Sequence, residues 1–169
     1  MARRSRLADG LSSAERALTV ELTALVLARV APEELVVLDE TAAEYFADPQ
    51  AALRSDGSDT PLGSGITVAM MTPYLLAASS VVLPVLGTVA GELGKDIAKD
   101  LVKDPVVDRI RRLFKRQPDQ PSPGPEALSI EQAGRVRQAV VAQCHAVGLP
   151  AQQAALVADA TVGALHVRG

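Results

Sequence analysis

The sequence predicts an all-α protein, mostly a helical bundle around one central apolar segment (residues 66–91), with a helical hairpin at its C-terminal end. Three observations favour this fold. Apolar residues recur at helical intervals on both sides of the segment, and two capping-box sequences mark helix starts. Aromatic residues are scarce, since the chain has two Tyr, two Phe and no Trp. A core of Ala, Val and Leu favours close helix packing over a β-sandwich.

Two amphipathic helices are expected near the N-terminus. Ser12 and Glu15 have capping-box spacing, and leucines follow at helical intervals, which predicts a helix over 13–30. Pro32 suits the first turn of a second helix, because a proline there lacks no needed hydrogen bond. This second helix is expected to end at about Phe46.

The rest of the N-terminal unit, residues 1–54, is less regular. β-Branched residues in LVVLDE leave a short strand near 35–38 as an alternative to helix. The stretch DPQAALRS is interpreted as one further helical turn. Residues 55–65 are rich in Gly, Ser and Asp, which predicts a flexible loop.

The apolar segment 66–91 permits two interpretations. No Asp, Glu, Lys or Arg occurs between Thr60 and Gly91. A helix over 66–91 is long enough to cross the ~30 Å hydrocarbon layer of a membrane. Against a span, the segment is rich in Gly, Pro, Ser and Thr, and Pro84 predicts a kink. Gly87 and Gly91 have the spacing that lets two helices approach closely, in lipid or in a soluble bundle.

A basic amphipathic helix is expected to follow within the same unit, residues 66–116. Apolar residues recur every fourth position from Leu93 to Leu101, with Lys-Asp pairs between them. One long helix over about 85–104 is expected, restarting at Pro105. Its end, RIRRLFKR, places five basic residues within eight. Cations at this position also suit the negative end of a helix dipole.

The C-terminal part is predicted to be a proline-rich linker, residues 117–128, followed by a helical hairpin, residues 129–169. Ser129 and Gln132 repeat the capping-box spacing, and valines follow on one face of the helix. Gly148-Leu149-Pro150 ends this helix and starts the last one. A hairpin of this size is small for independent stability, so it is expected to pack on the rest of the chain or on a partner.

Composition and charge narrow the function classes. The formal net charge is -3, with an acidic N-terminal part and a locally basic stretch over 92–118, which is weak evidence against nucleic acid binding. Cys144 is the single cysteine, so no intramolecular disulfide is expected and a reducing compartment is the simplest interpretation. Acidic residues interrupt the N-terminal apolar run, so no signal peptide is expected. Frequent Ala, Val, Arg and Gly suggest a GC-rich bacterial gene.

No pattern in the sequence predicts an enzyme. Gly63-Ser64-Gly65 lacks the Lys and Ser or Thr of a phosphate-binding loop. Cys144 and His145 are adjacent and lie about 100° apart on a helix, so they do not form a nucleophile and base pair. His145, His166 and Asp159 are too few for a metal site. No catalytic residue, cofactor or metal is therefore expected.

Two functions remain. In the first, the protein is a small helical membrane-associated protein on the cytoplasmic side, with 66–91 in or on the bilayer and 95–116 as a juxtamembrane helix on anionic lipid. In the second, it is a cytoplasmic α-helical adaptor or assembly module with 66–91 as its buried core, binding a protein partner or a second copy. The residues expected at the membrane or partner contact are Val82, Leu86, Val89, Arg109, Arg111, Arg112, Lys115 and Arg116.

Overall fold

The computed structural model describes residues 11–54, 71–93, 105–115 and 127–168. These residues form seven α-helices and one short 3-10 helix, and no extended strand. The prediction of an all-α fold is therefore confirmed. In chain order the elements are α2 (Ser13–Val30), η1 (Pro32–Val37), α3 (Leu38–Ala47), α4 (Pro49–Arg54), α5 (Thr72–Leu93), α6 (Pro105–Leu113), α7 (Ile130–Ala146) and α8 (Ala151–Gly163).

Both predicted capping boxes are present. At the start of α2, the Ser12 N–H donates to Glu15 Oε2 at 2.7 Å, and the Glu15 N–H donates to Ser12 Oγ at 3.2 Å. At the start of α7, Ser129 and Gln132 exchange the same pair of bonds at 2.8 and 3.1 Å. Two helix starts predicted from sequence are thus confirmed to the residue.

The second predicted helix is divided into two parts. Residues Pro32–Val37 form the 3-10 helix η1, and α3 begins at Leu38. The strand considered near 35–38 does not form, because Pro32 favours a helical first turn and the Glu34 N–H donates to the Ala31 carbonyl at 3.0 Å. Val36 is left 88% exposed, so its β-branched side chain lacks the packing that would favour a strand.

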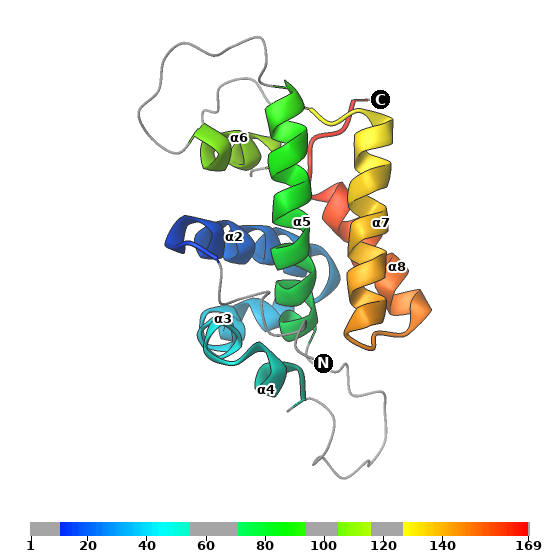
Figure 1. Ribbon diagram of the computed structural model, residues 1–169. Helices are drawn as coiled ribbons and strands as arrows, with labels where there is room; N and C mark the ends of the chain where they lie inside the picture. Colours follow the sequence, from blue (N-terminus) through cyan, green and yellow to red (C-terminus); the bar gives the residue numbers. More distant parts are fainter. Residues whose placement is uncertain (1–10, 55–70, 94–104, 116–126, 169) are drawn as a thin grey trace, which may run out of the picture.

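Helix α5 lies in the middle of the fold. In Figure 1 it stands between α2, α3 and α4 on one side and α7 and α8 on the other, with α6 beside its C-terminal part. It contacts α2, α3, α4, α6 and α7. Its buried residues join those of the other helices in one hydrophobic core, and the helix continues through Pro84. The described part of the apolar segment is therefore in the helix on which five of the six other α-helices pack.

The C-terminal hairpin is formed by α7 and α8. Gly148, with φ of 92°, makes the turn between them in a conformation that other residues rarely adopt. Helix α7 packs on α5, and α8 packs on α2, so the hairpin shares the core of the preceding helices. The residues that follow α8 form hydrogen bonds with residues before and after the gap at 116–126. The Lys115 N–H donates to the Ala164 carbonyl, and the Leu128 N–H donates to the His166 carbonyl, each at 2.8 Å.

Several predicted segments lie outside the described residues. They include the loop 55–65, the first residues of 66–91, and all of the linker 117–128 except its last two residues. The long helix expected over 85–104 is described only as far as Leu93, and the structure is described again from α6 onward.

Candidate binding groove

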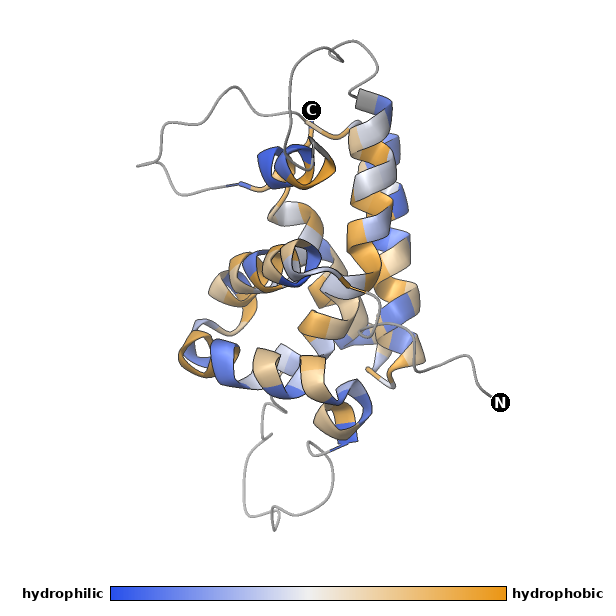
Figure 2. Cartoon of the chain, turned by 60° about the vertical axis from the view of Figure 1, so that its left-hand side comes forward, coloured by the Kyte–Doolittle hydropathy of each residue, from blue (hydrophilic) through white to orange (hydrophobic). Residues whose placement is uncertain are grey.

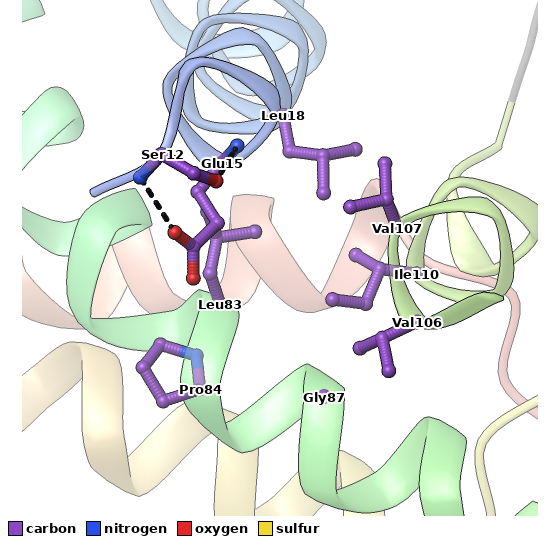
Figure 3. A pocket seen from close by; sticks show the side chains of 9 residues that line it. All are labelled: Ser12, Glu15, Leu18, Leu83, Pro84, Gly87, Val106, Val107 and Ile110. Carbon is purple, nitrogen blue, oxygen red and sulfur yellow. Dashed lines mark hydrogen bonds between the residues drawn. The ribbon is translucent and has the colours of Figure 1, made fainter. Parts of the chain in front are cut away.

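An apolar groove of about 310 Å³ lies where α6 approaches the middle of α5, beside the N-terminal end of α2 (Figure 3). This volume is at the lower end of the range for small-molecule sites and is enough for one or two large side chains. The lining residues are Ser12, Glu15, Leu18, Leu83, Pro84, Gly87, Val106, Val107 and Ile110.

The groove has a buried floor and a partly exposed rim. Leu18, Leu83 and Ile110 are almost completely buried and form the floor. Pro84 is exposed and Val106 is 42% exposed, so the rim presents apolar surface to solvent. Exposed apolar surface beside a concavity is typical of a binding site, because a ligand can cover it without reorganising the core.

Helix α6 lies against α5 at a glycine. A Cβ atom on Gly87 would meet Val106 Cγ1 at 3.6 Å and Ile110 Cδ1 at 3.9 Å, so the missing side chain leaves the space that becomes the groove. Figure 2 shows α6 divided into a hydrophobic and a hydrophilic side. The hydrophobic side supplies the groove wall, and the hydrophilic side carries most of the basic residues.

An ion pair attaches α6 to α2. Arg111 Nη2 donates to Glu21 Oε1 at 2.9 Å, and Arg111 Nε donates to Glu21 Oε2 at 3.1 Å. The hydrogen bond to the Glu21 carboxylate raises the pKa of Arg111. Asp108 lies 3.7 Å from the same guanidinium. This two-point contact fixes the orientation of α6, because a planar guanidinium matches a carboxylate in one geometry.

Among the described residues that line the groove, Glu15 is the one with an ionisable side chain. Its carboxylate extends from α2 toward Leu83 and Pro84 of α5 (Figure 3). Oxygen Oε2 accepts the Ser12 N–H of the capping box, and no basic side chain of the described residues forms an ion pair with it. The groove therefore combines an apolar interior with one negative charge at its edge.

The residues predicted to contact a membrane or partner divide into two groups. Val82, Leu86 and Val89 are fully buried in the core, on the faces of α5 that other helices cover. A contact through these residues requires α5 to leave the bundle.

The basic group of predicted residues is on or just after α6. Arg109 and Arg112 are partly exposed, Lys115 is exposed, and Arg111 is bound to Glu21. Arg112 Nε donates to the Asp108 carbonyl of its own helix at 3.3 Å. Arg116 lies outside the described residues. The basic residues are thus present on α6, and the guanidinium group of Arg111 is used inside the fold.

Sequence reasoning did not identify the groove. Its lining comes from three helices, and the residues that shape it are Pro84, Gly87 and Val106. Pro84 and Gly87 were interpreted as signs of a kink and of close helix packing. The one local signal is a glycine three residues after a proline in an apolar helix, and only the position of α6 shows which side of α5 remains open.

The described residues include no group of three or more His, Cys, Asp or Glu side chains that could hold a metal ion. Cys144 is buried on α7, and burial raises the pKa of its thiol to about 11, so it is protonated at neutral pH. His145 is exposed, so the two neighbouring side chains lie in different environments.

Comparisons of the chain with models of protein families, with curated protein sequences and with solved structures found no match. Function is therefore inferred from the groove, from the position of α5 and from the charges around them.

Proposed function

We propose that the protein is a non-enzymatic α-helical interaction module of the cytoplasm. Helix α5 is its structural core, and the surface formed by α2, α5 and α6 binds a protein partner. The observation that carries this proposal is the enclosure of α5: Val82, Leu86 and Val89 are fully buried, while Pro84 and the groove beside it remain open. An apolar helix whose faces are covered by other helices is typical of the centre of a bundle.

Polar contacts of α5 with the other elements support the same proposal. The buried Thr23 hydroxyl of α2 donates to Ser79 Oγ of α5 at 3.1 Å. The Glu34 carboxylate of η1 accepts hydrogen bonds from the Met71 and Thr72 N–H groups at 2.9 and 2.8 Å. Such contacts require one register of the helices, which apolar packing alone does not impose.

Affinity capture with paired variants tests the proposal. The full chain is used as bait in a lysate of the source cells, beside Val106→Glu, which places a charge on the groove rim. Leu156→Glu is the matched control, because Leu156 is 51% exposed on α8 and does not line the groove. We expect a partner that is captured by the wild type and the control and lost with Val106→Glu. A set of captured proteins that is the same for all three baits would contradict the proposal.

A second candidate function is conditional association with a membrane, on its cytoplasmic side. Two observations favour it. Residues Thr72–Glu92 form a helix long and apolar enough to cross a bilayer, although 61% of its most apolar stretch is buried in the bundle. Arg109, which is partly exposed, and Lys115, which is exposed, supply basic groups on or beside α6 that suit anionic lipid. Insertion would require the covering helices to move away from α5.

Vesicle flotation separates the two candidates. The purified chain is mixed with neutral or anionic vesicles at low and high salt. The membrane candidate predicts flotation with anionic vesicles, reduced by salt and by the double substitution Arg109→Gln and Lys115→Gln. The interaction module predicts that the protein stays in the unbound fraction with both vesicle types. Surface substitutions are used because a change at Val82 would also disrupt the core.

A further inference from the structure

We propose that the groove between α2, α5 and α6 binds a cationic peptide segment of a partner, one that carries a large apolar side chain next to a Lys or Arg. Glu15 sets the preference for the positive charge. This inference rests on the proposed function as an interaction module. It adds the chemistry of the partner, which the bundle alone does not define.

The preference for a large apolar side chain follows from the residues that line the groove. Its floor is formed by Leu18, Leu83 and Ile110, and its rim includes Pro84 and the partly exposed Val106. A large side chain seated there would bury the rim without opening the core. Interfaces typically obtain most of their binding free energy from one or two such anchors in a preformed pocket.

The preference for a Lys or Arg follows from the position and the contacts of the Glu15 carboxylate. Its carboxylate lies at the groove (Figure 3). It accepts the Ser12 N–H at 2.7 Å on Oε2, and within the described residues no cation pairs with it. A Lys or Arg of the partner would supply a positive charge beside this carboxylate, in a site that the bound apolar side chain shields from water. An acidic segment would meet repulsion at the same point.

The basic residues of α6 do not reverse this preference. Arg111 is bound to Glu21 and lies close to Asp108, so its charge is largely balanced within the fold. Arg112 donates to the carbonyl of Asp108, and none of the three arginines of α6, Arg109, Arg111 and Arg112, lines the groove. Among the described residues that line the groove, the charged side chain is therefore that of Glu15.

The chain also supplies a matched variant that removes the charge and keeps the fold. In Glu15→Gln, the side-chain oxygen can still accept the Ser12 N–H, because Gln also completes a capping box. The second capping box of this protein already uses a glutamine, Gln132, which accepts the Ser129 N–H at 2.8 Å. Glu15→Gln thus isolates the effect of charge on binding from the effect of the cap on stability.

The probe is a display library of random 12-residue peptides, selected on the full-length chain and counter-selected on Val106→Gln, which makes the groove rim polar without adding a charge. We expect the selected peptides to combine a large apolar residue with a neighbouring Lys or Arg. In fluorescence polarisation, Glu15→Gln should weaken the best peptide by about tenfold. Replacing the basic residue of the peptide by Gln should have the same effect, and combining both changes should add little.

Four results would overturn the inference. The proposed partner chemistry is wrong if the selected peptides are acidic or uncharged, or if Glu15→Gln leaves their affinity unchanged. In either case, capture from lysate that Val106→Glu abolishes would still support the proposed interaction module. Sedimentation in which the wild type is a dimer and Val106→Glu a monomer would assign the groove to a second copy of the chain. The fourth result would also reject the proposed function: no selected peptide depends on the groove, and Val106→Glu captures the same proteins from lysate as the wild type.

Discussion

Replacing Glu34 by Gln should lower the free energy of unfolding by about 2–3 kcal/mol, because this carboxylate holds the start of α5. Glu34 is 8% exposed on η1. Its Oε1 accepts the Met71 N–H at 2.9 Å, and its Oε2 accepts the Thr72 N–H at 2.8 Å and the Thr72 hydroxyl at 2.6 Å. The next residue, Pro73, has no N–H. Glu34 therefore satisfies backbone donors that the first turn of α5 leaves unpaired.

The magnitude follows from what an amide can replace. The oxygen of Gln can still accept from Thr72, but its NH₂ group would face the Met71 N–H, which leaves two donors opposed. An unsatisfied buried donor costs about 1–3 kcal/mol. The bonds that remain change from charge-assisted to neutral, a further loss of about 1 kcal/mol each. Removing the cost of burying a carboxylate offsets part of this sum.

Urea unfolding followed by circular dichroism measures the effect. With a slope of about 2 kcal/mol per molar urea, the midpoint of Glu34→Gln should fall by about 1 M or more. Glu33→Gln, an exposed neighbour on the same 3-10 helix, is the control and should change stability by less than about 0.5 kcal/mol. Equal midpoints for Glu34→Gln and Glu33→Gln would refute the role assigned to Glu34.

Three further predictions concern residues of α5 and α7. Gly87→Ala and Gly91→Ala should each raise the free energy of unfolding by about 0.5–1 kcal/mol, because a Cβ at either position meets no atom closer than 3.6 Å. Thermal unfolding measures this, and a loss of stability for Gly91→Ala would indicate a helix contact at that position. Val82→Asp should unfold the protein, because it places an unpaired charge at a fully buried site, and native helical content measured by circular dichroism would contradict this. Cys144 should react with a thiol reagent at pH 8 only after denaturant is added, since it is buried and protonated; rapid labelling of the native protein would show that α7 opens.

The sequence predicted local features better than contacts between distant residues. Ser12 and Ser129 begin their helices where the capping boxes indicated, because a capping box is complete within four residues. The contact between Glu34 and Thr72 joins residues far apart in the chain, and no local pattern marks it. The exposed side of α5 was equally unpredictable, since a helix that is apolar all round has no preferred face in its sequence.

Hydropathy records how many apolar residues a helix has, but not which groups bind its polar ones. In α5, the hydroxyl of Ser80 donates to the Leu76 carbonyl of the same helix at 2.8 Å, a bond that would persist in lipid. Thr72 instead depends on Glu34, and Ser79 on Thr23 of α2. Moving α5 into a bilayer would break both of these contacts, so they oppose insertion and stabilise the bundle.

The same variant that tests the start of α5 therefore also tests the membrane candidate. If α5 inserts after release from the bundle, Glu34→Gln should float with anionic vesicles more than the wild type does, because the substitution increases the fraction of released chains whose α5 can enter lipid. If α5 is only a core helix, Glu34→Gln should lose stability and remain in the unbound fraction. Unchanged stability together with increased flotation would contradict both accounts, since lipid would then reach α5 without the bundle opening.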